Sequence, residues 1–306
     1  MKVGFFSEIG DSVGGNKKLS RAHRNARTDL AWCMALDAPL CSLTNLPNEK
    51  FDLGIVIIPK NNPNVDLNHI RKVCDKVAIM QEGPHWFFQD YTVEWQFHYY
   101  NTLVDADWIY CHNESDVNYF LGLGCKDVRV MRSLMIPAGL RPRSELGDGI
   151  MIGGNFVSWY GGFDSYMVAR EIGSSMSAPS MGRKQDQESM IEDINYLPYM
   201  TWREWIKTLG QYNIGVHLMR THAAGTFAMN CGFHGIPCIG YKGLDTQEIL
   251  HPLTTVEIGD LDGAKEVAIK LRSDRFYKLC SDTIKKRFEQ NYTEKAWLKD
   301  WETRHG

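Results

Sequence analysis

The sequence predicts an α/β protein made of two Rossmann-like domains, each built on a doubly wound parallel sheet. Short apolar segments alternate with longer amphipathic segments, which is the pattern of strand-helix-strand units. The pattern occurs twice, and the proline- and glycine-rich segment IPAGLRPRSELGDG at residues 136–149 separates the two series. The 306 residues are enough for two domains of ordinary size. We therefore expect domains at 1–142 and 143–291 that face each other across a cleft.

The first series contains five predicted strands, which are the apolar runs near residues 2–6, 53–58, 77–81, 108–111 and 128–131. Between the first two runs, apolar residues from Leu19 to Met34 recur at spacings of three and four. This spacing predicts a helix with one buried face and one charged face. Ser20 is placed to cap the start of that helix.

The second series predicts strands near residues 149–153, 195–197, 214–219, 237–241 and 255–258. Residues 173–189 are small and polar, which indicates at most a short strand followed by a loop. From Gly263 onward the pattern is helical. Trp297 and Trp301 are four residues apart and share one helix face, so we expect the segment 292–306 to cross back and pack on the first domain.

Composition and charge exclude several classes of protein. Hydrophobic residues make up 43% of the chain, which excludes a long disordered or fibrous chain. The formal net charge of -3 excludes a polycation that wraps nucleic acid. The eight cysteines include no C-x-x-C pair or zinc-type array, which indicates reduced thiols and a cytoplasmic protein. The densest apolar run, LGIVIIP, is too short to span a membrane.

The most informative segment is IGVHLMRTHAAGTFAMNCGFHGIPCIGY at residues 214–241. It predicts a buried strand, a loop of small residues, a short helix capped by Thr226 and ended by Gly235, and a second buried strand that begins at Pro237. Backbone N–H groups at such a helix start, here those of Gly225 and Thr226, suit a phosphate or diphosphate. Arg220 precedes the loop and is placed to pair with the same anion. The alternative interpretation is a plain tight turn.

Within this segment, NCGFHGIPCIG resembles the nucleotide-sugar site of the GT-B glycosyltransferases, with Gly235, Pro237 and Ile239 on the family pattern. Residues 194–219, 153–172 and 105–116 also resemble parts of that family. The resemblance implies the GT-B fold and transfer of a hexosyl or pentosyl group to an acceptor hydroxyl. It implies a nucleotide diphosphate sugar, with a UDP-sugar preferred, as the donor substrate, and no tightly bound cofactor.

The sequence departs from the family where retaining members carry two glutamates eight residues apart. His222 and Asn230 occupy those positions. Asn230 is able to bind ribose hydroxyls and His222 a sugar hydroxyl or phosphate, but neither supplies a fixed negative charge. The glutamate-based mechanism is therefore not implied. The remaining donor-binding candidates are the neighbouring Thr221 and, as phosphate cations, Arg183, Lys184 and Arg220, although a solvated loop explains Arg183 and Lys184 equally well.

In the first domain, MQEGPHWFFQDY at residues 80–91 follows a predicted strand and places acidic and imidazole groups among aromatic residues. A sugar stacks well on aromatic rings, and a nearby carboxylate or histidine is suited to deprotonate an acceptor hydroxyl. Glu82 is closest to the strand end, so we rank it above His85 as the base. The alternative is that the aromatic residues only pack a helix start.

A glycine pair and a basic cluster follow the first strand. In GT-B enzymes a glycine-rich loop at this place faces the cleft, which would add Gly14 and Gly15 to the donor site. Downstream basic residues suit an anionic acceptor such as double-stranded DNA, although a solvated helix face also explains them. Segments 80–91 and 100–116 resemble phage-encoded glycosyltransferases, some of which modify hydroxymethylcytosine in DNA. The predicted acceptor-binding residues are Lys18, Arg21, Arg24 and Arg27.

Other motifs argue against competing functions. The chain lacks G-x-G-x-x-G after the first strand and lacks a P-loop, which disfavours dinucleotide oxidoreductases and P-loop NTPases. Residues 105–107 form a D-x-D motif, but at the amino end of a strand and thus away from the cleft, so we assign no metal. Two alternatives remain open: an inactive GT-B-like protein that binds sugar nucleotides, and an epimerase of the same fold.

Overall fold

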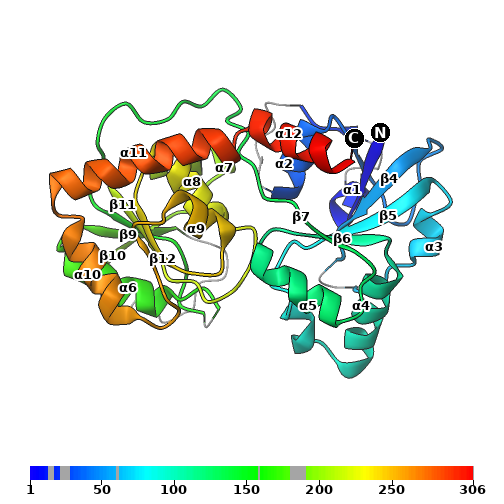
Figure 1. Ribbon diagram of the computed structural model, residues 1–306, viewed down its shortest axis with the longest axis horizontal. Helices are drawn as coiled ribbons and strands as arrows, with labels where there is room; N and C mark the ends of the chain where they lie inside the picture. The colour runs from blue at the N-terminus through cyan, green and yellow to red at the C-terminus, as the bar shows by residue number, and fades with distance from the viewer. Residues whose placement is uncertain (13–16, 21–27, 60–61, 158, 180–190, 306) are drawn as a thin grey trace.

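The computed structural model describes residues 1–12, 17–20, 28–59, 62–157, 159–179 and 191–305. It contains two separate sheets in two lobes (Figure 1). The first sheet has the order β2-β3-β1-β4-β5-β6-β7, and the second has the order β10-β9-β8-β11-β12-β13. Every described strand pair is parallel except β2 with β3. The predicted α/β class with two Rossmann-like domains is confirmed.

The first sheet is covered by helices on both faces because successive side chains in its strands point to opposite sides. Phe5 and Ile55 face a core completed by α2 and α12, whereas Phe6 and Val56 face a core completed by α3, α4 and α5. The strands are β1 (Val3–Phe6), β2 (Lys17–Lys18), β3 (Pro39–Cys41), β4 (Phe51–Val56), β5 (Cys74–Met80), β6 (Trp108–Cys111) and β7 (Val128–Val130). The helices are α1 (Glu8–Ser12), α2 (Thr28–Ala35), α3 (Leu67–Ile70), α4 (Val93–Asp105) and α5 (Val117–Gly122), with short 3₁₀ helices η1 (Phe87–Asp90) and η2 (Glu114–Asp116).

The helix predicted after the Ser20 cap lies only partly in the described residues. Leu19 and Ser20 lie in irregular chain, residues 21–27 are outside the described ranges, and the described helix α2 begins at Thr28. All residues of α2 are buried, so the predicted charged face is also wrong there. The reason is that α2 lies between the sheet and α12, and the Trp32 ring contacts both Tyr110 and Trp297.

The second sheet is also covered on both faces. Helices α6 and α10 pack together on one side, and α7 and α8 pack on the other, where α11 contacts α8 and α9. The strands are β8 (Ile150–Ile152), β9 (Met176–Pro179), β10 (Ile194–Leu197), β11 (Ile214–His217), β12 (Cys238–Tyr241) and β13 (Thr255–Val256). The helices of this lobe are α6 (Gly162–Ile172), α7 (Trp202–Leu209), α8 (Thr226–His234), α9 (Asp245–Leu250), α10 (Leu261–Lys270) and α11 (Asp274–Asn291). The last helix, α12 (Glu294–His305), belongs to the first lobe.

The chain passes between the lobes twice, and the two crossings lie side by side. The Met135 N–H donates to the Tyr292 carbonyl at 2.9 Å. After the second crossing, α12 lies beside α2 in the first lobe (Figure 1). Trp297 and Trp301 are buried in the first-lobe core, and the Trp297 indole N–H donates to the Arg132 carbonyl at 2.7 Å. The domain limits at 142 and 143 stay a prediction.

The state of the cysteines and the absence of a membrane-spanning segment were also expected from the sequence. All eight cysteines lie in the described part of the chain as buried free thiols, and burial raises the pKa of Cys41 and Cys74 to about 12. Among the described residues, no helix has both the length and the apolar character needed to cross a membrane.

Candidate active site

A cavity of about 320 Å³ lies between the two lobes. In the second sheet the strand order reverses between β8 and β11, and the carboxyl ends of two such strands form the usual ligand crevice of an open parallel sheet. The cavity is at this place, because it is lined by Gly153 after β8 and by His217 at the end of β11. The first lobe closes the opposite wall with Thr28, Glu82, Gly83, Pro84 and Phe87.

The N-terminus of α8 forms one wall of the cavity. The cap of this helix is Gly225, with φ +64°, and not the predicted Thr226, which is the first helical residue. A Cβ at Gly225 would collide with the Thr246 side chain, so the turn requires glycine. The N–H groups of the first helical turn have no acceptor within the helix and carry its partial positive charge. Thr221, Gly225 and Thr226 all line the cavity. This wall is therefore suited to bind an anion.

Two buried polar atoms in the cavity lining have no hydrogen-bond partner among the described residues. One is Oδ1 of Asn230, a residue that is 4% exposed, and the other is Nε2 of His217. Burial lowers the pKa of His217 to about 4, so its ring is neutral at pH 7. A buried polar group without a partner costs free energy, which a polar ligand would recover. The cavity thus has the features of a binding site.

Sequence reasoning found Asn230 but missed His217. The predicted strand extended to Met219, which placed His217 inside the strand rather than at its end. The sequence signal that was available is the adjacent pair Gly153 and Gly154, because paired glycines often mark a place where another group packs closely on the backbone. Gly153 and Gly154 pack so tightly on the His217 ring that a Cβ at Gly153 would lie 2.7 Å from its Cγ.

Aromatic rings form much of the remaining lining. Flat rings of this kind stack on nucleobases and on the apolar faces of sugars. The rings of the second lobe were also missed as site residues, although they lie in segments 153–172 and 194–219, where the sequence resembles the GT-B family, and in the first turn of α8. The aromatic lining residues are Phe87, Trp159, Tyr160, Trp205 and Phe227.

None of the predicted basic side chains that the structure describes lines the cavity. Arg220 is 55% exposed, lies outside the lining, and pairs with Asp164 at 2.8 Å. Lys18 is exposed in β2 and pairs with Asp37 at 2.5 Å. The other predicted donor and acceptor groups lie outside the described ranges, namely Gly14, Gly15, Arg21, Arg24, Arg27, Arg183 and Lys184.

The three catalytic candidates separate into two places. Glu82 lines the cavity, whereas His85 and His222 lie outside its lining and meet at Asp116. Oδ1 of Asp116 is 3.2 Å from Nδ1 of His85 and 2.9 Å from Nδ1 of His222. Burial would raise the pKa of Asp116, but hydrogen bonds from His222, His85 and Asn113 outweigh it and hold that pKa well below its usual range. Asp116 was missed because these contacts join distant parts of the chain.

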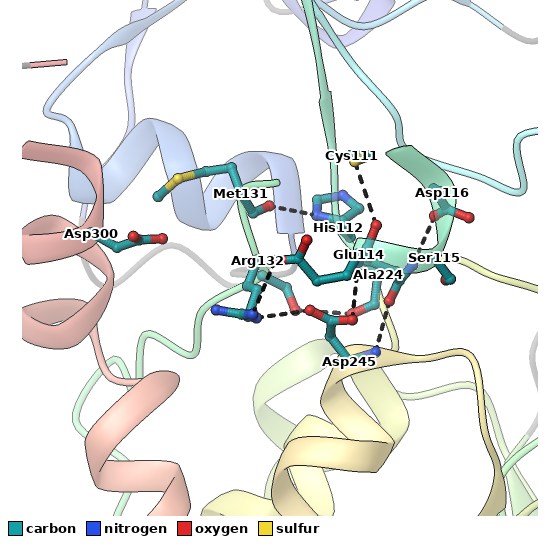
Figure 2. Close-up of polar contacts among 12 residues, drawn as sticks. Cys111, His112, Glu114, Ser115, Asp116, Met131, Arg132, Ala224, Asp245 and Asp300 are labelled. Atoms are coloured by element: carbon teal, nitrogen blue, oxygen red, sulfur yellow. Dashed lines mark hydrogen bonds and ion pairs between the residues drawn. The ribbon is translucent and has the colours of Figure 1, made fainter. Parts of the chain in front are cut away.

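Polar contacts between the lobes fix the loop that precedes α8. Figure 2 shows the charged part of this network, in which Arg132 Nε donates to Asp245 Oδ2 at 2.9 Å and the Glu114 N–H donates to Asp245 Oδ1 at 3.1 Å. Ser133 Oγ donates to the Ala224 carbonyl at 2.9 Å. Asn113 Nδ2 donates to the neighbouring carbonyl of residue 223 at 3.0 Å. The shape of the loop before α8 therefore depends on both lobes.

Solved structures of glycosyltransferases have the same fold. The chain is similar to a point mutant of S. aureus TarM in complex with fondaparinux, alpha-GlcNAc-glycerol and UDP, with TM-score 0.63, 11% identity, and coverage of 82% of this chain and 55% of TarM. It is similar to sucrose-phosphate synthase from Thermosynechococcus elongatus, with TM-score 0.65, 12% identity, and coverage of 83% and 73%. The fold is GT-B. The Anabaena protein Alr3699/HepE, in complex with UDP and glucose, matches with TM-score 0.61, 8% identity, and coverage of 83% and 77%.

The chain spans about half of TarM, the first of these structures. No protein-family model and no curated protein matches the sequence. At identities of 8% to 12%, the likeness concerns the fold, and the chemistry has to be argued from the site.

Proposed function

We propose that the protein is a glycosyltransferase that moves a hexosyl group from a nucleotide diphosphate sugar, with UDP-sugars preferred, to an acceptor hydroxyl. The observation that carries this proposal is the interlobe cavity, where the N-terminus of α8 adjoins the unpartnered atoms of Asn230 and His217. TarM and HepE, which have the same fold, were crystallised with UDP. These facts support a nucleotide-sugar site at the same place.

In this proposal the diphosphate binds to the N–H groups of Gly225 and Thr226, and Thr221 contributes its hydroxyl. Asn230 binds the ribose, and the aromatic lining stacks on the base or the sugar. As the bond from the anomeric carbon to the phosphate breaks, negative charge develops on the leaving diphosphate. Preorganised donors stabilise that charge by about 3 to 4 kcal/mol each in comparable sites. The cations Arg183 and Lys184 stay proposed phosphate ligands.

Glu82 is our proposed base for the acceptor hydroxyl. It extends the wall formed by the first lobe and lines the cavity opposite the anion-binding loop. We rank it above His85, because Nδ1 of His85 is already engaged with Asp116. A carboxylate at Glu82 would accept the proton as the acceptor oxygen attacks the anomeric carbon.

The acceptor is the second part of the proposal. The proposal of hydroxymethylcytosine in phage DNA rests on four predicted acceptor-binding residues, of which Lys18 lies in the described ranges and the three arginines do not. The alternative acceptor is a glycan or a small molecule, and a cavity of about 510 Å³ with a lining separate from that of the donor cavity is a candidate place for it. This cavity lies past the carboxyl ends of β1 and β4 in the first lobe, and Glu8, Asp11 and Asp66 line it together with asparagines. Carboxylates there would repel a phosphodiester backbone.

The test is mass spectrometry after incubation with a panel of nucleotide sugars and either hydroxymethylated DNA or plain glycans. A product whose mass has increased by one sugar supports transfer and identifies the acceptor class. Glu82→Gln is expected to lower kcat by about 100-fold or more, with Glu302→Gln, an exposed glutamate on α12, as the matched control. Donor binding without transfer or hydrolysis would instead support the inactive sugar-nucleotide-binding protein, and an isomerised donor would support an epimerase.

A further inference from the structure

Three side chains with metal-binding atoms converge where the two lobes meet. His85 and Asp116 come from the first lobe, and His222 comes from the loop before α8 in the second. Their ligand atoms all lie within 4.8 Å of one another. The Asp116 side chain is 0% exposed, while His85 and His222 keep 20% and 21% of their side chains exposed. The carboxylate is thus buried, and the cluster is still open to a small ion.

We propose that His85, Asp116 and His222 form a binding site for a divalent transition metal, with Zn²⁺ as the preferred ion. Both imidazoles direct Nδ1 at the same oxygen of Asp116, at 3.2 and 2.9 Å. Around a tetrahedral zinc ion with bonds of about 2.0 to 2.1 Å, neighbouring ligand atoms lie about 3.3 Å apart. Small side-chain adjustments would therefore place the three atoms around one ion.

The surroundings of the cluster orient its ligands. Asn113 Nδ2 donates to Oδ2 of Asp116 at 3.0 Å, which leaves Oδ1 directed at the two histidines. Ser115 Oγ lies 3.1 Å from Nδ1 of His222 and is placed to supply an oxygen as the fourth ligand. Supporting hydrogen bonds of this kind fix ligand geometry in metal sites. Two imidazoles with one or two oxygens make a ligand set that suits zinc.

The charge balance also favours a cation. A buried carboxylate is costly unless a positive charge compensates it. Across the described ranges, the ion-pair partners of Asp116 are the two histidines, and no lysine or arginine joins them. Burial raises the pKa of Cys111 to about 12, and the negative charges of Asp116, Glu114 and Asp245 contribute to this rise. Arg132 pairs with Glu114 and Asp245 but not with Asp116. Figure 2 shows these three carboxylates around the same interlobe contact.

Spacing in the sequence gave no indication of this site. His85 is 31 residues from Asp116 along the chain, and His222 is 106 residues from it. Zinc motifs that are recognisable in a sequence instead contain pairs of ligands only a few residues apart. The sequence-based assignment of no metal relied on such local patterns. An ion at this site would join the two lobes directly, because two ligands belong to one lobe and the third to the other.

The experiment uses the full chain, freed of metal by dialysis against a chelator. Zn²⁺ is titrated in competition with a chromophoric chelator, and we expect one equivalent bound in the micromolar range or tighter. Co²⁺ provides a second readout, because a tetrahedral site with nitrogen and oxygen ligands gives intense visible absorption bands. His85→Gln and His222→Gln should each weaken Zn²⁺ affinity by on the order of 100-fold. His98→Gln, on the surface of α4, is the matched control and should bind like the parent.

The proposal is overturned if the parent chain binds no stoichiometric Zn²⁺, or if both glutamine variants bind it as tightly as the parent. Because the Co²⁺ spectrum is recorded on the parent chain, the test does not depend on the folding of a variant. UDP binding measured in the presence of the chelator separates this site from the donor cavity. If UDP still binds when the chelator has removed the metal, and Zn²⁺ still binds at one equivalent when UDP is absent, the two sites are independent.

Discussion

Acid should destabilise the second lobe through its buried histidines, and His251 is the clearest case. This residue is 1% exposed, its Nδ1 accepts from the Cys238 N–H at 3.2 Å, and its Nε2 donates to the Ala228 carbonyl at 2.9 Å. Protonation of Nδ1 would place its new N–H against the N–H of Cys238, so this hydrogen bond would be lost. Burial is the main cause that lowers the pKa of His251 from 6.5 to about 4.

The sign follows from linkage between protonation and folding. As the pH falls below 6.5, the unfolded chain takes up a proton at His251 that the folded chain does not, so the free energy of unfolding decreases. At about 1.4 kcal/mol per pH unit of pKa difference, this histidine accounts for a loss of about 3 kcal/mol once the pH is below about 4. About 2 kcal/mol of that loss falls between pH 7 and pH 5.

Urea unfolding of the parent and of His251→Gln at pH 7 and pH 5 tests this value. The variant loses stability at pH 7, but it lacks the titrating group, so its deficit relative to the parent should shrink by about 2 kcal/mol at pH 5. His98→Gln removes a histidine whose side chain is 35% exposed on α4 and serves as the control. A deficit of His251→Gln that is equal at the two pH values would refute the reasoning.

Three further predictions concern the active site and the lobes. Gly225→Ala introduces a Cβ that collides with Thr246 and should weaken UDP binding at least tenfold by calorimetry; unchanged affinity would exclude the α8 amides as ligands. Trp297→Ala removes a side chain that is 2% exposed in the first-lobe core. The free energy of unfolding, measured by urea denaturation, should fall by about 3 to 5 kcal/mol. A loss below about 1 kcal/mol would contradict the core role of this residue. Asn113→Ala leaves the carbonyl of residue 223 and the Asp245 N–H without their partner across the lobes, at a cost in stability of about 1 to 3 kcal/mol each. The midpoint of thermal unfolding should therefore fall, and an unshifted midpoint would show that these hydrogen bonds are dispensable.

The sequence was most informative where local pattern decides structure. The run at 108–111 predicted β6 with its limits, because four consecutive buried residues form a central parallel strand. The motif before α8 predicted the start of that helix to within one residue, with the cap expected at Thr226 and found at Gly225. The binding of an anion at this helix start stays a prediction. The short strand β3 (Pro39–Cys41) was not predicted, because three residues are too few to show a period.

The missing parts depend on contacts between distant residues. The complete burial of α2 required knowledge that α12 would cover it. The meeting of His85, Asp116 and His222 required the two lobes to be placed against each other. A single sequence records neither contact, since periodicity reports only whether a side is buried and not what buries it. The position of Glu82 beside the cavity was predictable because it depends on one strand end alone.

The double crossing between the lobes affects the order of folding during synthesis. The second lobe is formed by one continuous stretch of chain and has all its strands and covering helices once α11 has been made. The first lobe still lacks Trp297 and Trp301 at that stage, so one side of α2 remains exposed to water. We therefore expect the first lobe to be completed after the second, once α12 has left the ribosome. A ribosome stalled before Glu294 should hold the first lobe in a form prone to aggregation.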